Sequence, residues 1–213
     1  SKQVASKQVA DTYDVPASTM VAIWGAESNF GRFTGVRPTI SALATLAFDQ
    51  RRSSLFRREL FSALEILDRG DIELSALRGS WAGAMGQPQF MPSSYLQYAE
   101  DFDGDGRRNI WDSHPDIFAS IANYLRAYGW MAGQPWGREV KLSKELAAQI
   151  QVDVPSRDGS CQARRNMTVA LPLEEWQRRG VRRLNGDALP SIDQQASLVS
   201  GSARHFLVYE NYD

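Results

Sequence analysis

The sequence predicts a mainly helical α+β protein, and three observations lead to this class. The chain has 213 residues, of which 43% are hydrophobic and 23% charged, as is typical of an ordered globular protein. Before residue 130, several segments repeat apolar residues at helical spacing. Beyond Gly133 the chain becomes more polar and richer in turn residues, with short β-like runs. We therefore expect a helical domain over 1–130, a smaller mixed α/β subdomain over 131–205 and a short final segment over 206–213.

The first clear helix is expected over Ala17–Ser28, after Asp14 and Pro16, which suit a helix start, with Gly31 at its end. One face of this helix carries an apolar row that ends on a carboxylate: Met20, Ile23, Trp24 and Glu27. Apolar surroundings would raise the pKa of Glu27, as a general acid working near neutral pH requires. From this helix alone, a structural glutamate hydrogen-bonded to the backbone remains the alternative.

Four more helices are expected in the first domain. Segments 40–48 and 54–68 have apolar residues at helical spacing, and the second of them has four leucines between charges. Segments 93–100 and 115–128 flank an acidic stretch, and the latter has the apolar stripe Ile117, Ile121, Tyr124 and Leu125. In the second part we expect strands at 140–142, 167–171 and 206–209, and one helix between Pro172 and Gly180.

Residues 79–99 have the composition of a sugar-binding surface. They contain no Asp or Glu and have no helical or strand period over 79–92. Neutral hydrogen-bonding groups alternate with apolar and aromatic ones, including Ser80, Gln87, Gln89, Ser93, Ser94, Tyr95 and Tyr98 beside Trp81 and Phe90. Sugars need partners for their hydroxyls and flat apolar contacts for their ring faces. A well-packed irregular core loop is the alternative.

The acidic stretch has the spacing of an EF-hand calcium loop. Oxygen ligands are expected at alternate positions, with Gly106 at the sharp turn, from Asp101, Asp103, Asp105, the Arg107 carbonyl, Asn109 and Asp112. Asp112 replaces the usual glutamate and is one methylene shorter. The alternative is a solvated acidic turn without a metal.

The charge balance argues against nucleic acid as a partner. Twenty-four basic and twenty-five acidic residues leave a formal net charge of -1. A polyanion binder needs a strongly basic surface. The single cysteine, Cys161, excludes an internal disulfide and a thiolate metal cluster.

Four blocks of sequence, in order and spanning roughly half the chain, resemble the membrane-bound lytic transglycosylase B family. They are AIWGAESNFGRFTG at 22–35, ALATLAF at 42–48, GSWAGAMGQPQFMPSSYLQYAEDFDGDGRRNIWD at 79–112 and SIANYLRAYGW at 120–130. The resemblance implies a lysozyme-like core with a helical insertion near 36–78 and a calcium loop at 101–116. It also implies cleavage of peptidoglycan between N-acetylmuramic acid and N-acetylglucosamine, which leaves a 1,6-anhydromuramoyl end.

By this resemblance, Glu27 is the single catalytic acid and base. It would protonate the glycosidic oxygen and then, as a carboxylate, take the proton of the C6 hydroxyl of muramic acid while that oxygen attacks C1. Ordinary glycosidases of either stereochemical class need a second carboxylate. The carboxylate-free tract therefore suits a substrate that supplies its own nucleophile.

The resemblance also implies the residues that contact the substrate. Polar cleft residues are Ser80 and Gln89, apolar wall residues are Met85 and Phe90, and the cleft tyrosine is Tyr124, for which core packing is the alternative. Arg51 and Arg52 could hold muropeptide carboxylates through bidentate hydrogen bonds, or could be a solvated helix cap. Segment 206–213 would begin a C-terminal core segment that is cut short here, with Asn211 and Tyr212 at the edge of the cleft. In the family a later aspartate closes the calcium loop, so either Asp112 or Asp116 would do so here.

The same resemblance implies a structural Ca²⁺ and no organic cofactor. It also implies a periplasmic location, with outer-membrane anchoring of the full-length protein. We further expect a monomeric protein whose partners are peptidoglycan glycan strands and other cell-wall enzymes. Two alternatives stay open, a hydrolytic muramidase and a non-catalytic, calcium-stabilised module that binds peptidoglycan.

Overall fold

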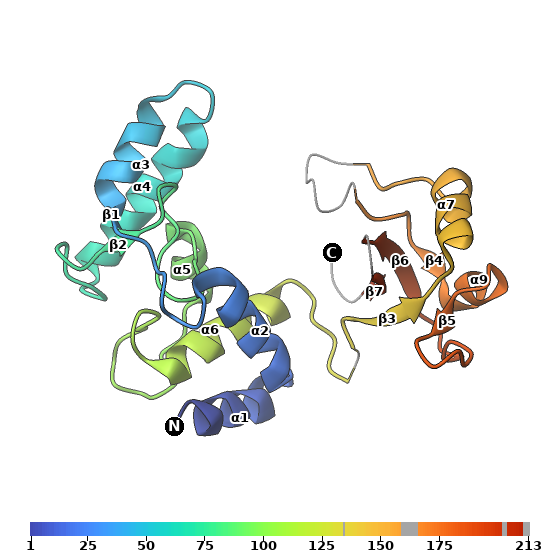
Figure 1. Ribbon diagram of the computed structural model, residues 1–213. Helices are drawn as coiled ribbons and strands as arrows, with labels where there is room; N and C mark the ends of the chain where they lie inside the picture. The colour runs from blue at the N-terminus through green and yellow to red at the C-terminus, as the bar shows by residue number, and fades with distance from the viewer. Residues whose placement is uncertain (134, 159–165, 202–203, 211–213) are drawn as a thin grey trace. The chain divides into compact units, whose positions relative to one another are not determined.

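The computed structural model describes residues 1–133, 135–158, 166–201 and 204–210 (Figure 1). The chain divides into two compact units, Ser1–Ala132 and Gly133–Asp213. Among the described residues, no helix is both long and apolar enough to cross a membrane.

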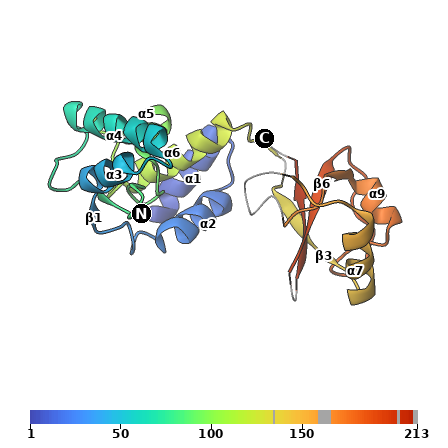
Figure 2. The same cartoon turned by 90° about the horizontal axis from the view of Figure 1, so that it is seen from above.

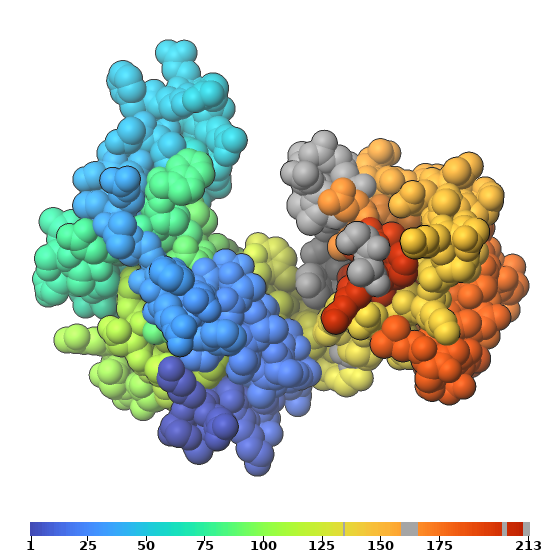
Figure 3. Space-filling model, in the orientation of Figure 1, coloured from blue at the N-terminus to red at the C-terminus, as the bar shows by residue number. Residues whose placement is uncertain are grey.

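The first unit is built from helices. These are α1 (Lys2–Tyr13), α2 (Ala17–Ser28), α3 (Thr39–Phe48), α4 (Ser53–Asp68), α5 (Pro92–Tyr98) and α6 (His114–Ala127). Two short strands, β1 (Arg37–Pro38) and β2 (Arg78–Gly79), pair antiparallel at the base of the α3–α4 hairpin. This hairpin projects from the rest of the unit (Figures 1 and 3).

Helix α6 is the central helix of the unit, since its residues 116–122 are all buried, and its start is well capped. The Ser113 side chain accepts a hydrogen bond from the backbone N–H of Asp116, and Arg126 lies in the last turn, where a cation suits the helix dipole. Its buried face packs on α1 and α2 in one apolar cluster: Val9, Met20, Trp24, Ile117, Phe118 and Ile121. A second cluster joins α3, α4 and α5 to the loop before α5, with Leu43, Ile66, Met85, Phe90 and Tyr95 at its centre.

The second unit has a five-stranded antiparallel sheet in the order β4-β6-β7-β3-β5. The strands are β3 (Gly137–Lys141), β4 (Leu171–Pro172), β5 (Arg182–Arg183), β6 (Gln195–Ser200) and β7 (His205–Tyr209). Helices α7 (Lys144–Asp153) and α9 (Leu173–Arg178) cover one face of the sheet (Figure 2). Their side chains Ile150, Leu173 and Trp176 form a core with Val140, Leu198 and Leu207.

The described elements correct several expectations from the sequence. Residues 206–210 do not start a separate core segment, because β7 pairs with both β6 and β3 inside the second unit. Within the expected strand 167–171, Met167 and Thr168 form only isolated bridges. Helices α1 and α7 and strand β6 were not predicted. Helix α2 ends at Ser28, and the left-handed residue that caps it is Asn29, with a φ of 48°, rather than Gly31.

Candidate active site

A cavity of about 340 Å³ lies at the C-terminal end of α2 in the first unit. Helix α2 supplies Ile23 and Glu27, and the loop before α5 supplies the wall opposite. The other lining residues are Pro88, Gln89, Phe90 and Met91 of that loop, Ser94 of α5, and Ile121, Tyr124 and Leu125 of α6. Four predicted site residues therefore meet in one cavity: Glu27, Gln89, Phe90 and Tyr124.

Glu27 is the only acidic residue among the described residues that line this cavity. Its side chain is reachable from solvent, yet partial burial raises the pKa of its carboxyl above the ordinary glutamate value. No hydrogen bond or ion pair holds this carboxylate within the part of the chain that the structure describes. Within those residues, Glu27 has none of the backbone hydrogen bonds that the structural alternative requires.

Helix α2 is held in place by the side chain of Gln87. The indole N–H of Trp24 donates to Gln87 Oε1 at 2.6 Å, and Gln87 Nε2 donates to the carbonyl of Trp111 at 2.6 Å. Gly31 leaves room for this amide, since a Cβ there would lie 2.4 Å from Gln87 Oε1. Gln87 is a buried structural residue, although its place in the polar tract suggested contact with a sugar.

The polar tract folds as a tight loop, and this decides which of its residues reach the cavity. Met85 and Phe90 exchange two backbone hydrogen bonds, of 2.8 and 3.0 Å. Between them, Gln89 has a positive φ of 54°, and its side-chain amide donates to the carbonyls of Thr34 and Gly86. Its Oε1 atom makes no hydrogen bond within the described residues and could accept one from a ligand.

Two predicted cleft residues have structural positions instead. Met85 is 0% exposed and packs beneath the loop in the second apolar cluster, so it cannot contact a ligand in the cavity. Ser80 does not line the cavity, and its hydroxyl accepts hydrogen bonds from the backbone N–H groups of Ala82 and Ala84. Both stabilise the loop that presents Gln89 and Phe90.

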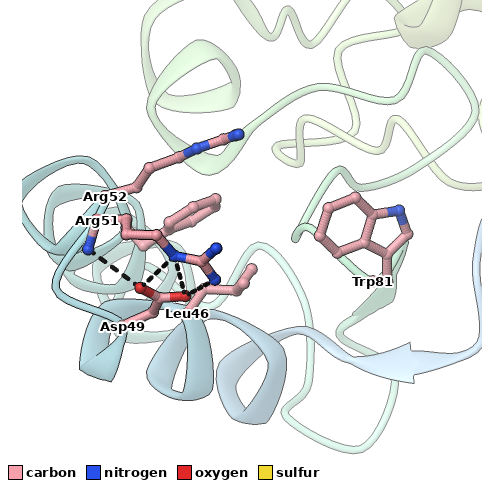
Figure 4. Close-up of a pocket in the computed structure, with 6 residues that line it drawn as sticks. Leu46, Asp49, Arg51, Arg52 and Trp81 are labelled. Atoms are coloured by element: carbon pink, nitrogen blue, oxygen red, sulfur yellow. Dashed lines mark hydrogen bonds and ion pairs between the residues drawn. The ribbon is translucent and has the colours of Figure 1, made fainter.

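Arg51 and Arg52 line a different pocket, of about 200 Å³, which shares no lining residue with the Glu27 cavity. The carboxylate of Asp49 accepts hydrogen bonds from the backbone and guanidinium of Arg51, and these bonds lower its pKa to about 2. Trp81, 71% exposed, lies across the pocket from this pair (Figure 4). Arg52 forms no ion pair within the described ranges.

The acidic loop brings three carboxylates together. One oxygen each of Asp101, Asp103 and Asp116 lies within 4.8 Å of the others. Asp116 is fully buried, and its oxygens accept from the backbone N–H groups of Phe102, Asp103 and Asn109. Desolvation nevertheless raises the pKa of Asp116, although these three bonds favour its charged form. Among the described residues, no Lys or Arg side chain pairs with these three carboxylates.

This donor set fits a hard cation such as Ca²⁺, which binds carboxylate oxygens. Of the two aspartates that could close the loop, Asp116 joins the group, whereas Asp112 is exposed and lies outside it. Asp105 also lies outside, and it accepts a hydrogen bond from the backbone N–H of Arg107.

Several cavity residues were not recognised from the sequence. Ile121 and Leu125 were assigned to the core, because a helical stripe does not reveal where a core face becomes a cavity wall. Pro88 was overlooked among the turn residues of the tract. Asn211 and Tyr212, expected at the cleft edge, lie outside the described residues.

The family model described as "Transglycosylase SLT domain" matches residues 1–213. Membrane-bound lytic murein transglycosylase B of Escherichia coli K12 is 49% identical over 123 residues, which are 57% of this chain and 34% of that protein. The crystal structure of SltB3 from Pseudomonas aeruginosa in complex with NAG-anhNAM-pentapeptide has a TM-score of 0.83 and 44% identity, covering 97% of this chain and 53% of that one. The Escherichia coli lytic transglycosylase SLT35 in complex with calcium has a TM-score of 0.75 and 32% identity, covering 97% and 61%.

The chain thus spans about a third to three fifths of the length of these relatives. Its likeness to solved lytic transglycosylases confirms the predicted class, a mainly helical α+β fold with a lysozyme-like core. Because the family model matches the sequence from its first residue to its last, this chain belongs to the transglycosylase SLT domain family.

Proposed function

We propose that this chain is the catalytic part of a peptidoglycan lytic transglycosylase in which Glu27 is the single acid and base. The observation that carries the proposal is the Glu27 carboxyl, which has no hydrogen bond or ion pair within the described residues and is the only acidic group among those that line its cavity. Supporting it, SltB3, which is 44% identical to this chain over the aligned residues, was solved in complex with NAG-anhNAM-pentapeptide.

The proposed reaction needs one proton donor and one internal nucleophile. The raised pKa keeps Glu27 protonated at higher pH, so that it can give its proton to the glycosidic oxygen as the bond from C1 to that oxygen breaks. The resulting carboxylate takes the proton of the C6 hydroxyl of muramic acid as O6 bonds to C1. The products are a 1,6-anhydro end and a free hydroxyl, Glu27 is protonated again, and no water is consumed.

The other cavity residues suit binding of a neutral sugar. Gln89 Oε1, which makes no hydrogen bond within the described residues, can accept one from a sugar hydroxyl, and Ser94 adds a second polar group. Phe90 and Tyr124, with ring centroids 5.5 Å apart, offer apolar surface to a ring face. We assign Arg51 and Arg52 to the carboxylates of peptide stems, because their pocket is exposed and basic on one side.

A calcium ion would be held by Asp101, Asp103 and Asp116 and would cross-link the acidic loop to the start of α6. Its chemistry there would be structural, because its two positive charges would offset the repulsion among three carboxylates. We assign the protein to the periplasm, where peptidoglycan lies, with outer-membrane anchoring of the full-length protein.

Digestion of purified peptidoglycan, followed by mass spectrometry of the muropeptides, tests the proposal. The chain should release anhydromuramoyl products, and Glu27→Gln should lower the rate by a factor of about 10² to 10⁴. Hydrated reducing ends would instead identify a hydrolytic muramidase. Binding without cleavage by both proteins would identify a non-catalytic module, and unchanged activity of the variant would remove Glu27 from its role.

A further inference from the structure

Two of the three helices that line the Glu27 cavity, α5 and α6, each place a tyrosine one turn beyond it. Helix α6 contributes Tyr124 and Leu125 to the cavity, and Tyr128 follows at the end of the same helix face. Helix α5 contributes Ser94, and Tyr98 follows four residues later. The lining of the cavity therefore continues into a second aromatic surface within the first unit.

The rings of this surface form a continuous row. The centroid of Tyr124 lies 5.5 Å from that of Phe90, 5.1 Å from that of Tyr98 and 4.6 Å from that of Tyr128. The Tyr98 and Tyr128 centroids are 5.8 Å apart, so Tyr128 rests on both inner rings. We call Phe90, Tyr124, Tyr98 and Tyr128 the aromatic row.

Exposure changes along the aromatic row from its inner end to its outer end. Tyr98 is only 9% exposed, whereas Tyr128 is 44% exposed and is fixed from behind by its neighbours. A ring held in this way loses little conformational freedom when a ligand binds. It offers an apolar face together with a hydroxyl group, which suits a pyranose.

We propose that Tyr128 forms an outer sugar-binding position for a pyranose unit of the glycan strand beyond the two sugars joined by the scissile bond. The occupant follows from continuity, because a strand bound beside Glu27 and leaving along the aromatic row meets Tyr128 next. This inference rests on the proposed function, since it takes the strand in the cavity to be a glycan.

The test measures binding of N-acetylglucosamine oligomers of two and six units by calorimetry, in the Glu27→Gln background, which prevents cleavage. Adding Tyr128→Ala should weaken binding of the hexamer by about two- to tenfold, the range expected for one lost ring contact, and leave the dimer unchanged. Tyr128→Phe keeps the ring and should retain most of the affinity. Phe61→Ala, which removes an aromatic side chain of α4 that is 69% exposed and outside the aromatic row, should change neither.

Peptidoglycan cleavage separates this inference from the proposed function. Tyr128→Ala in the otherwise natural sequence should raise KM on long glycan strands and leave kcat unchanged. Two results would overturn the outer position while the natural chain still cleaves. In one, Tyr128→Ala leaves the affinity for the hexamer unchanged in the Glu27→Gln background. In the other, Tyr128→Ala lowers the affinity for the dimer and the hexamer equally. Failure of the natural chain to cleave or to bind either oligomer would overturn the proposed function itself.

Discussion

At the scale of the residue, the surroundings of Glu27 set the pH at which it can act. Partial burial raises its pKa, so the protonated form needed for the first step persists to higher pH. We predict that kcat/KM falls as pH rises through this raised pKa. Ile23→Thr, one turn before Glu27 in the same cavity, should admit water, lower the pKa and move this fall toward lower pH. A pH profile on peptidoglycan measures the shift.

The matched control for this variant is Val21→Thr, which makes the same kind of change on α2 outside the cavity. Its profile should keep the natural midpoint. If Ile23→Thr and Val21→Thr shift the profile equally, desolvation by the cavity is not what sets the pKa of Glu27.

Several residues that the sequence analysis selected as site candidates lie together in one cavity of the structure. A carboxylate at the end of an apolar helix face, Glu27, and the residues Gln89 and Phe90 of a carboxylate-free tract all reach the cavity. Ser80 and Met85 do not, because the pairing of Met85 with Phe90 turns one side of the loop inward, and composition alone does not contain that pairing. Gln87 differs from Gln89 by two positions and points into the core instead.

Arg52 is expected to act only on glycans that carry peptide stems. Because Asp49 already binds Arg51, the guanidinium of Arg52 is the more available of the two for a carboxylate of a peptide stem. We predict that Arg52→Ala raises KM for peptidoglycan with its peptides by about three- to tenfold and leaves KM for amidase-stripped glycans unchanged. Arg57→Ala, which removes an exposed positive charge from α4, is the control. Equal effects on both substrates would exclude a stem-binding role.

At the scale of the element, Gln87 joins α2 to the acidic loop through one side chain. Gln87→Leu would leave the buried indole N–H of Trp24 and the carbonyl of Trp111 without partners. We predict a loss of roughly 2–4 kcal/mol in the free energy of unfolding, since each unsatisfied buried group costs about 1–3 kcal/mol. Urea denaturation measures this loss. Gln97→Leu, an exposed position on α5, should cost less than about 0.5 kcal/mol, and equal costs for the two variants would contradict the bridging role.

The same loop provides a test that distinguishes the two aspartates able to close it. If Asp116 is a ligand, calcium at a hundred times its dissociation constant should add about 2.7 kcal/mol of stability, or roughly 5–10 °C in Tm. Asp116→Asn should abolish this increase, whereas Asp112→Asn should retain it, because Asp112 lies outside the carboxylate group. Thermal melts with calcium and with a chelator measure both. Loss of the increase in Asp112→Asn alone would reverse the assignment.

Helices that bury large apolar side chains were predictable, and helices that bury few were not. Helices α2, α3, α4 and α6 lie within one or two residues of their expected bounds. Helix α1 buries mainly Ala5 and Val9, and α7 buries only Ile150, so tertiary packing rather than a clear stripe holds them. Strand β6 is buried over three consecutive residues and lacks the alternation that marks a half-exposed strand.

At the scale of the whole molecule, each unit has a hydrophobic core of its own. The clusters around Ile117 and Leu43 belong to the first unit, and the cluster around Leu198 belongs to the second. Residues of the Glu27 cavity and of the carboxylate group all come from the first unit. The described residues that carry the proposed chemistry therefore lie within the first 132 residues, and the β-sheet lies in the second compact unit.

Separate cores predict separate losses of stability. Leu198→Ala removes a side chain that is 2% exposed from the sheet core, which should cost about 2–5 kcal/mol. Hydrogen exchange should then show reduced protection of the β6 and β7 amides, while the α2 and α6 amides keep theirs. Ile117→Ala, in the core of the first unit, should produce the reverse pattern, and added calcium should raise protection only in the first unit. If either variant lowers the protection of both units equally, the two units unfold together. Calcium bound in the acidic loop would then stabilise the sheet as well.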